Sequence, residues 1–85
     1  MTIRQRVDYY KEFVGKEPNN IKCLNNFANL KQKLGNYQSA KKLLLRALEV
    51  ESKNIDILFN LAECYQSLGE LDLAKEHAYK IINLK

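Results

Sequence analysis

Residues 21–54 read IKCLNNFANLKQKLGNYQSAKKLLLRALEVESKN, and residues 55–85 read IDILFNLAECYQSLGELDLAKEHAYKIINLK. The two segments align without a gap, and matched residues are 34 positions apart. The identical pairs include Ile21 and Ile55, Leu24 and Leu58, Asn26 and Asn60, Ala28 and Ala62, Leu34 and Leu68, Gly35 and Gly69, Ala40 and Ala74, and Lys41 and Lys75. A repeat of this period is typical of proteins built from stacked, similar units.

Apolar residues recur within each unit at three- and four-residue steps, which place side chains on one face of an α-helix. In the first unit, one such stripe precedes Gly35 and a second follows it, and Gly suits the left-handed conformation that closes a helix. Each unit therefore predicts a helical hairpin, and Ser52 or Asn54 is the expected cap of the following helix. Ala28 is expected to face Ala40, and Ala62 to face Ala74, which lets the helices of each hairpin approach closely.

Length and composition favour one small folded domain, because 46% hydrophobic and 28% charged residues are unlike a disordered tail. The chain has no apolar run of membrane-spanning length and starts without a signal-peptide pattern, so we expect a cytoplasmic protein that does not bind membranes. Residues 1–34 carry seven Lys and Arg against three acidic residues, whereas residues 35–85 carry seven of each sign. This basic region could steer acidic partners, but it is not dense enough to predict nucleic-acid binding.

No set of residues predicts catalysis. Cys23 and Cys64 lack the spacing of a metal or redox motif and are expected to be small apolar residues with free thiols. His77 is the sole histidine, and we expect it to be a semi-exposed spacer in the last helix. Without a paired carboxylate site or a Gly-rich phosphate loop, the sequence predicts a protein that is not an enzyme and has no cofactor or metal site.

The repeated residues resemble the tetratricopeptide repeat, a 34-residue helix-turn-helix pattern. The characteristic places hold Leu24, Phe27, Ala28, Lys31, Ala40, Leu44 and Ser52 in the first unit and Leu58, Leu61, Ala62, Tyr65, Ala74 and Ala78 in the second. Lys31 departs from the usual Tyr, Ser52 from Pro and Ala78 from a bulky residue. The resemblance implies an all-α fold, a right-handed α-α superhelix of stacked helical hairpins. About five helices are expected, near residues 3–15, 21–34, 37–51, 55–68 and 71–84.

The resemblance also divides the chain. Residues 21–54 are expected to form one repeat and residues 55–85 a second that is truncated at its C-terminus. Residues 1–20 resemble the second helix of a preceding repeat, although Arg6 occupies the place of Ala40. We expect this segment to be either a solvating cap or, by preference, the remnant of a repeat in a longer protein.

Binding of another protein is the function that the resemblance implies, because the first helices of successive repeats line a concave groove that holds a peptide or helix. The expected binding residues are Lys22, Asn25, Asn29, Lys33, Asp56, Phe59, Asn60 and Glu63. Asn26, Gln32, Gln66 and Ser67 are expected to face the same way. The amides have donors and acceptors for the backbone of an extended peptide, and Phe59 is a candidate anchor. The alternative is that Asn26 and Asn60 are solvated and bind nothing.

The sequence bears on two other modes of interaction. A variant of the family binds a C-terminal carboxylate through Lys, Asn, Asn, Lys and Arg, and Asn29 and Asn60 resemble its amides. Asn25 stands in place of the first Lys, and the later Lys and Arg fall beyond the chain, so a carboxylate clamp is not predicted. The alternative function is a scaffold or self-assembly unit that stacks through uncapped ends, which would make the chain a homo-oligomer or part of a longer repeat protein.

Overall fold

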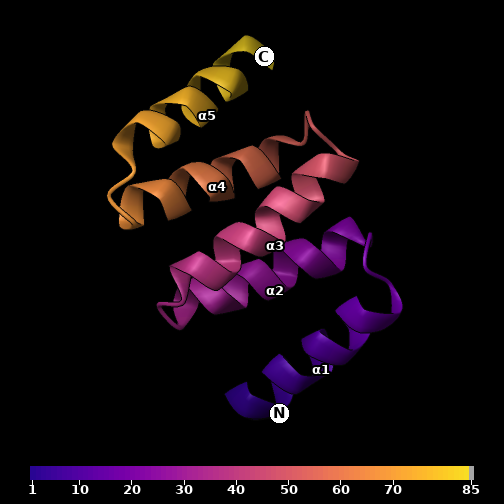
Figure 1. The fold of residues 1–85 in the computed structure, drawn as a ribbon. Coiled ribbons are helices and arrows are strands. Elements are labelled where there is room, and N and C mark those ends of the chain that lie inside the picture. Colours follow the sequence, from indigo (N-terminus) through magenta and orange to yellow (C-terminus); the bar gives the residue numbers. More distant parts are fainter. Residues whose placement is uncertain (85) are drawn as a thin grey trace.

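The computed structural model describes residues 1–84, a stack of five α-helices in which those residues form no strand. The helices are α1 (Ile3–Lys16), α2 (Ile21–Lys33), α3 (Tyr37–Val50), α4 (Ile55–Ser67) and α5 (Leu71–Leu84). They follow one another along an elongated molecule of 37 × 24 × 16 Å, with α1 at the bottom of Figure 1 and α5 at the top. The predicted all-α fold is confirmed, and each predicted helix end lies within one residue of the observed end.

Asparagine caps begin both first helices of the hairpins. The Oδ1 atom of Asn20 accepts a hydrogen bond from the Cys23 N–H at 3.0 Å, and Oδ1 of Asn54 accepts one from the Ile57 N–H at 3.2 Å. Each bond satisfies a backbone donor that the first turn of a helix leaves without a partner. Of the two caps predicted for α4, Asn54 is therefore the correct one.

Glycine ends the same two helices. Gly35 and Gly69 have φ angles of +80° and +78°, in the left-handed region that other residues rarely adopt. The turn after α2 lets the Asn36 N–H donate to the Lys31 carbonyl at 2.8 Å and the Gly35 N–H donate to the Gln32 carbonyl at 3.0 Å. This pair of bonds is the Schellman arrangement, and Gly69 makes the same turn between α4 and α5.

The core lies in the middle of the stack, where α2, α3 and α4 meet. The largest side chains without exposed surface are Leu24, Leu44, Ile57, Leu58, Leu61 and Cys64. Ala28 and Ala40 are also fully buried, as expected of small residues that let α2 and α3 approach closely. The outer helices contribute less, since α1 buries Val14 and α5 buries His77. The two ends of the stack therefore carry the open surfaces.

His77 was wrongly expected to be semi-exposed, because its side chain is only 5% exposed. Its Nδ1–H donates to the Leu73 carbonyl at 2.8 Å, and its ring lies 5.1 Å from the ring of Tyr65. The residue 34 positions earlier is Leu43, which packs against the core, so His77 occupies an inward position of α5. The neighbouring Ala78, which stands where the family usually has a bulky residue, is exposed.

Candidate functional site

The first helices of the two hairpins, α2 and α4, touch through a pair of amides. Asn60 donates from Nδ2 to Oδ1 of Asn25 at 2.8 Å, and the two residues are 35 positions apart in the chain. Both side chains are half-buried. The bond joins the exposed sides of α2 and α4 into one surface, which we call the α2–α4 groove.

The residues predicted to bind a partner differ in exposure. The charged and aromatic ones are exposed, namely Lys22, Lys33, Asp56, Phe59 and Glu63. The amides Asn25, Asn29 and Asn60 are half-buried. Because Asn25 and Asn60 bond to each other, one acceptor site and one N–H are already in use within the chain. Asn29 makes no side-chain hydrogen bond within residues 1–84 and keeps its full capacity.

Phe59 of α4 is 56% exposed. It borders an open hollow of about 510 Å³ between α4 and α5, which we call the C-terminal hollow; the apolar lining is Phe59, Ala62, Leu71, Ala74, Ala78 and Ile81. Sequence reasoning placed Phe59 in the groove but did not foresee this hollow. The available signal was the apolar stripe of the last helix.

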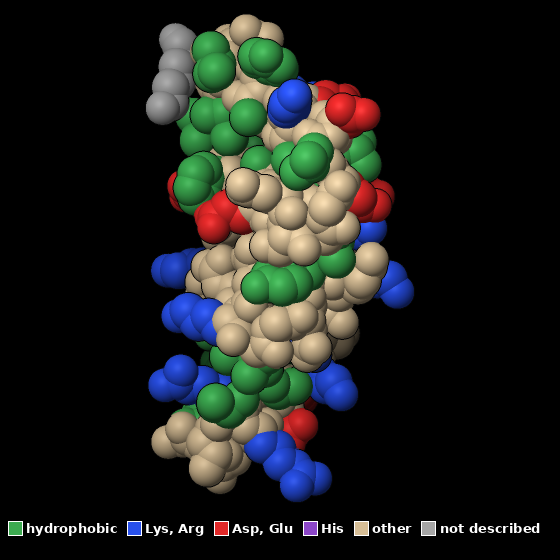
Figure 2. Space-filling model, turned by 90° about the vertical axis from the view of Figure 1, so that its left-hand side faces the viewer, with side chains coloured by type: hydrophobic (Ala, Val, Ile, Leu, Met, Phe, Trp, Pro, Cys, Tyr) green, Lys and Arg blue, Asp and Glu red, His purple; other side chains and the backbone are tan. Residues whose placement is uncertain are grey.

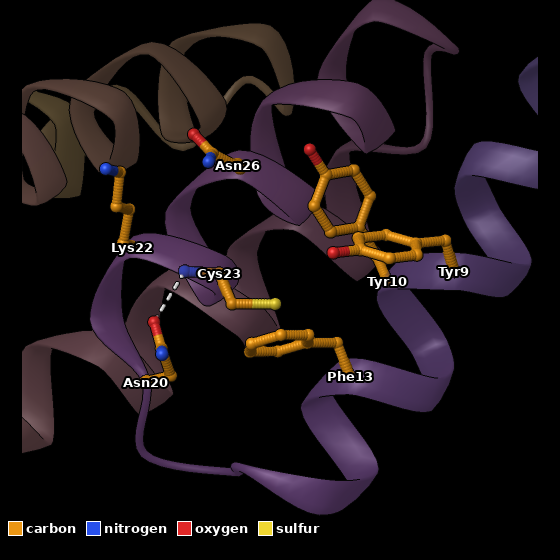
Figure 3. A pocket seen from close by; sticks show the side chains of 7 residues that line it. All are labelled: Tyr9, Tyr10, Phe13, Asn20, Lys22, Cys23 and Asn26. Atoms are coloured by element: carbon orange, nitrogen blue, oxygen red, sulfur yellow. Dashed lines mark hydrogen bonds between the residues drawn. The ribbon is translucent and has the colours of Figure 1, made fainter. Parts of the chain in front are cut away.

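Two further hollows, of about 220 and 430 Å³, lie between α1 and α2 and share Tyr9, Tyr10 and Asn26. Figure 3 shows Tyr9, Tyr10 and Phe13 projecting from α1 toward α2. The Tyr10 ring stacks on Phe27 of α2 at 5.6 Å between centroids, and Tyr9 packs edge-on against Tyr10 at 5.5 Å. Sequence reasoning missed the tyrosines as site residues, because it treated their helix as a cap or remnant.

Charge is distributed unevenly along the stack. Figure 2 shows Asp and Glu gathered mainly in the upper part, over α4 and α5, while Lys and Arg dominate the lower part. In the α2–α4 groove, Lys22 and Lys33 come from α2, whereas Asp56 and Glu63 come from α4. The groove therefore has a basic side and an acidic side.

Comparison with known proteins identifies the family. Residues 32–78, more than half of the chain, match the sequence model described as "Tetratricopeptide repeat". The chain belongs to the tetratricopeptide repeat family. Proteins of this family are generally interaction modules rather than enzymes. The match runs from the end of α2 into α5, so it follows the helices without testing where one repeat ends and the next begins.

Two individual proteins are similar to this tetratricopeptide repeat chain. "Tetratricopeptide repeat protein 8" of Caenorhabditis elegans is 31% identical over 67 residues, which are 79% of this chain and 13% of that protein. The chain thus spans about an eighth of its relative. A solved structure, the second tetratricopeptide domain of Spaghetti (RPAP3) bound to the HSP90 peptide SRMEEVD, superposes with a TM-score of 0.89. It is 18% identical, and the match covers 98% of this chain and 77% of that one, so the likeness is one of fold.

The thiols of the tetratricopeptide stack are not poised for chemistry. Burial, with a smaller contribution from Glu63, raises the pKa of Cys64 to about 11, although Lys41 acts in the opposite direction. Burial and then Glu17 raise the pKa of Cys23. Because the thiolate is the nucleophile, a raised pKa disfavours reaction of either thiol at neutral pH. Within residues 1–84, no group of three His, Cys, Asp or Glu side chains is placed to hold a metal ion, and none of the helices has the length and apolarity needed to cross a membrane.

Proposed function

We propose that the chain is a protein-interaction module that binds a peptide or helix of a partner in the α2–α4 groove. The observation that supports it most is the bond between Asn25 and Asn60, which holds the two first helices side by side. Around that bond, the charged and aromatic side chains of the groove remain exposed. Because the centre of this surface is already held in place, a partner that binds the exposed side chains around it would have to order few groups, which lowers the entropic cost of binding.

The groove offers complementary contacts to an extended segment. Asn29 can both donate to and accept from a peptide backbone, whatever the peptide's side chains. Lys22 and Lys33 favour acidic side chains on the α2 side, and Asp56 and Glu63 favour basic ones on the α4 side. Such a field selects the direction in which a peptide lies across the groove. The peptide held by the similar Spaghetti domain supports a polypeptide as the class of ligand.

The carboxylate clamp is not part of this proposal. Asn25 takes the place of the clamp's first Lys, and its Oδ1 is occupied by Asn60. The proposal further assigns residues 21–54 and 55–85 to two repeats of a longer cytoplasmic repeat protein, with residues 1–20 as the second helix of a preceding repeat. It assigns the chain no catalytic activity, cofactor, membrane contact or nucleic-acid ligand.

The test measures affinity for a partner captured by pull-down with the intact parent protein. Asn29→Ala should weaken binding roughly 2- to 13-fold, because an amide-backbone bond contributes about 0.5–1.5 kcal/mol. Phe59→Ala should weaken it more if the ring is a buried anchor in the complex. Lys42→Ala, on the exposed side of α3, is the control and should change nothing. Unchanged affinity in both groove variants would refute the proposal, above all if changes on second helices abolished binding.

A second candidate function is assembly through the open ends, and the C-terminal hollow favours it. Ala28 and Ala40, which correspond to Ala62 and Ala74 at 34 residues' distance, are fully buried. Within residues 1–84, Ala62 and Ala74 are only half-buried and line the C-terminal hollow, and Ile82 is 65% exposed. Light scattering over a concentration series tests this function. A monomer at high concentration that Ile82→Glu leaves unaltered would argue against assembly through this end.

A further inference from the structure

The α2–α4 groove carries opposite charges on its two sides. The exposed charged side chains are Lys22 and Lys33 on α2 and Asp56 and Glu63 on α4. None of them forms an ion pair in the part of the chain that the structure describes. Two rows of charge, one basic and one acidic, are therefore available to a ligand that lies between them.

The accessibility of these rows does not depend on where the stack ends. The positions of α2 that correspond to Asp56 and Glu63 are Lys22 and Asn29, 34 residues earlier. The following first helix, α4, is present beside them and is bonded to α2, yet Lys22 stays exposed and Asn29 stays half-buried. A further hairpin stacked on α5 would leave the groove side of α4 accessible in the same way.

Distances along the two helices set the spacing of the charges. In Figure 1, α2 and α4 run in the same direction, and the hydrogen bond between their asparagines fixes their register. Lys22 and Asp56 are each the second residue of their helix. At a rise of about 1.5 Å per residue, Lys33 lies about 16 Å beyond Lys22, and Glu63 lies about 10 Å beyond Asp56. The acidic row is therefore shorter than the basic row.

An extended peptide that lies along the groove matches these spacings. Its successive side chains point to opposite sides, and it rises about 3.3 Å per residue. If its first and fifth residues face α2, they are about 13 Å apart, and the second and fourth residues then face α4 about 7 Å apart. Flexible Lys and Arg side chains cover the remaining difference of about 3 Å in each row. An extended chain also has free backbone groups for Asn29, whereas a helix bonds most of its own.

Arginine is the cation that suits the α4 side. Phe59 lies between Asp56 and Glu63 at three- and four-residue steps, so the three residues share one helix face. The ring of Phe59 is 56% exposed. A guanidinium group can stack on such a ring and pair with a carboxylate through two N–H groups.

We propose that the α2–α4 groove binds an extended segment with the charge order Glu-Arg-x-Arg-Glu. The outer carboxylates pair with Lys22 and Lys33, the inner guanidinium groups pair with Asp56 and Glu63, and the backbone of the central residue bonds to Asn29. This inference rests on the proposed function and goes beyond it, because it states the conformation of the ligand and the order of its charges.

The experiment titrates the isotope-labelled chain, followed by NMR, with two acetylated and amidated pentapeptides of identical composition. One is Glu-Arg-Ser-Arg-Glu, and its isomer is Glu-Glu-Ser-Arg-Arg. The first should bind on the order of tenfold more tightly, because the isomer keeps two of the four ion pairs and places its other charges beside side chains of like sign. Both peptides have zero net charge, and added salt should reduce the difference. The side-chain amide signals of Asn29 should shift on binding.

A compensating pair of substitutions locates the site. Glu63→Lys should weaken Glu-Arg-Ser-Arg-Glu on the order of fivefold or more, because the fourth residue then meets a like charge. The peptide Glu-Arg-Ser-Glu-Glu should recover most of that loss in this variant, whereas a disturbed fold would weaken both peptides. The matched control is Glu49→Lys on the exposed side of α3, which changes the net charge equally and should have little effect on either peptide.

Four results would overturn the inference: equal affinity for the two isomers, equal weakening by Glu49→Lys, no recovery with the compensating peptide, or no binding of either isomer. Tighter binding of a helical peptide of three Glu-Ala-Ala-Ala-Arg units would also overturn it, since the groove would then hold a helix. Failure here is separable from failure of the groove proposal. If Asn29→Ala weakens the captured partner while the isomers bind equally, the groove is the binding site and only the charge order is wrong.

Discussion

Replacing Ala28 with Leu tests how the hairpins close. Ala28 has no exposed surface and belongs to the same buried cluster as Ala40, in the region where α2, α3 and α4 meet. The larger side chain would have to displace α3 or α4, and overpacking of this kind costs about 1–3 kcal/mol. A loss of about 2 kcal/mol corresponds to a melting temperature lower by roughly 8–16 °C for a chain of this size.

The chain provides a matched control at Ala62, 34 residues later. Ala62 is half-buried and borders the C-terminal hollow of about 510 Å³, where a Leu side chain has room. Ala62→Leu should therefore change stability by no more than about 0.5 kcal/mol. The same substitution at equivalent positions should thus have different effects, because only the first position is covered by a further helix.

Urea denaturation followed by far-ultraviolet circular dichroism measures both variants. The slope of the free energy of unfolding against urea should stay equal to that of the wild type, so that the midpoints report stability alone. Equal losses in the two variants would show that Leu wedges α4 from α5 as well. An unchanged midpoint for Ala28→Leu would refute the argument that small residues are needed where α2 and α3 approach.

Two further predictions concern the turns and a thiol. Gly35→Ala should lower the free energy of unfolding by on the order of 1 kcal/mol, because Gly35 has a φ of +80°. Gly15 lies inside α1, and a Cβ added there would meet nothing within 4 Å, so Gly15→Ala should raise the free energy of unfolding by about 0.5–1 kcal/mol. Thermal melts measure both effects. Burial raises the pKa of Cys64 from 9.0 to about 11, so the contribution of this thiol to stability should be constant below pH 9 and fall by up to about 1.4 kcal/mol per pH unit between 9 and 11. Denaturation of Cys64→Ala at the same pH values should lack this extra slope, and an identical slope would contradict the assignment.

Local signals explain why the fold could be predicted so closely from the sequence. Asn54 and Gly69 act through bonds to backbone groups within a few residues, so their effect on helix ends does not depend on the rest of the structure. The 34-residue period then identifies which helices are equivalent. Helix bounds therefore follow from residue types, and the observed ends agree to within one residue.

Features that depend on how helices are rotated against each other were harder to foresee. The burial of His77 does not follow from its neighbours in sequence, but it agrees with that of Leu43, its counterpart one period earlier. The bond between Asn25 and Asn60 needs the distance between two helices, which no local pattern supplies. The candidate site was thus predicted as a set of residues on first helices, while the pairing of its amides came from the structure.

The two ends of the stack differ in the residues at equivalent positions of the repeat. At the C-terminal end, Ala62 and Ala74 keep the small residues of the covered face, so this surface resembles one that accepts a helix. At the N-terminal end, Arg6 and Phe13 replace the corresponding alanines, and aromatic side chains line the hollows between α1 and α2. Because both ends derive from the same hairpin pattern, these substitutions, rather than the fold, make the surfaces of the two ends different.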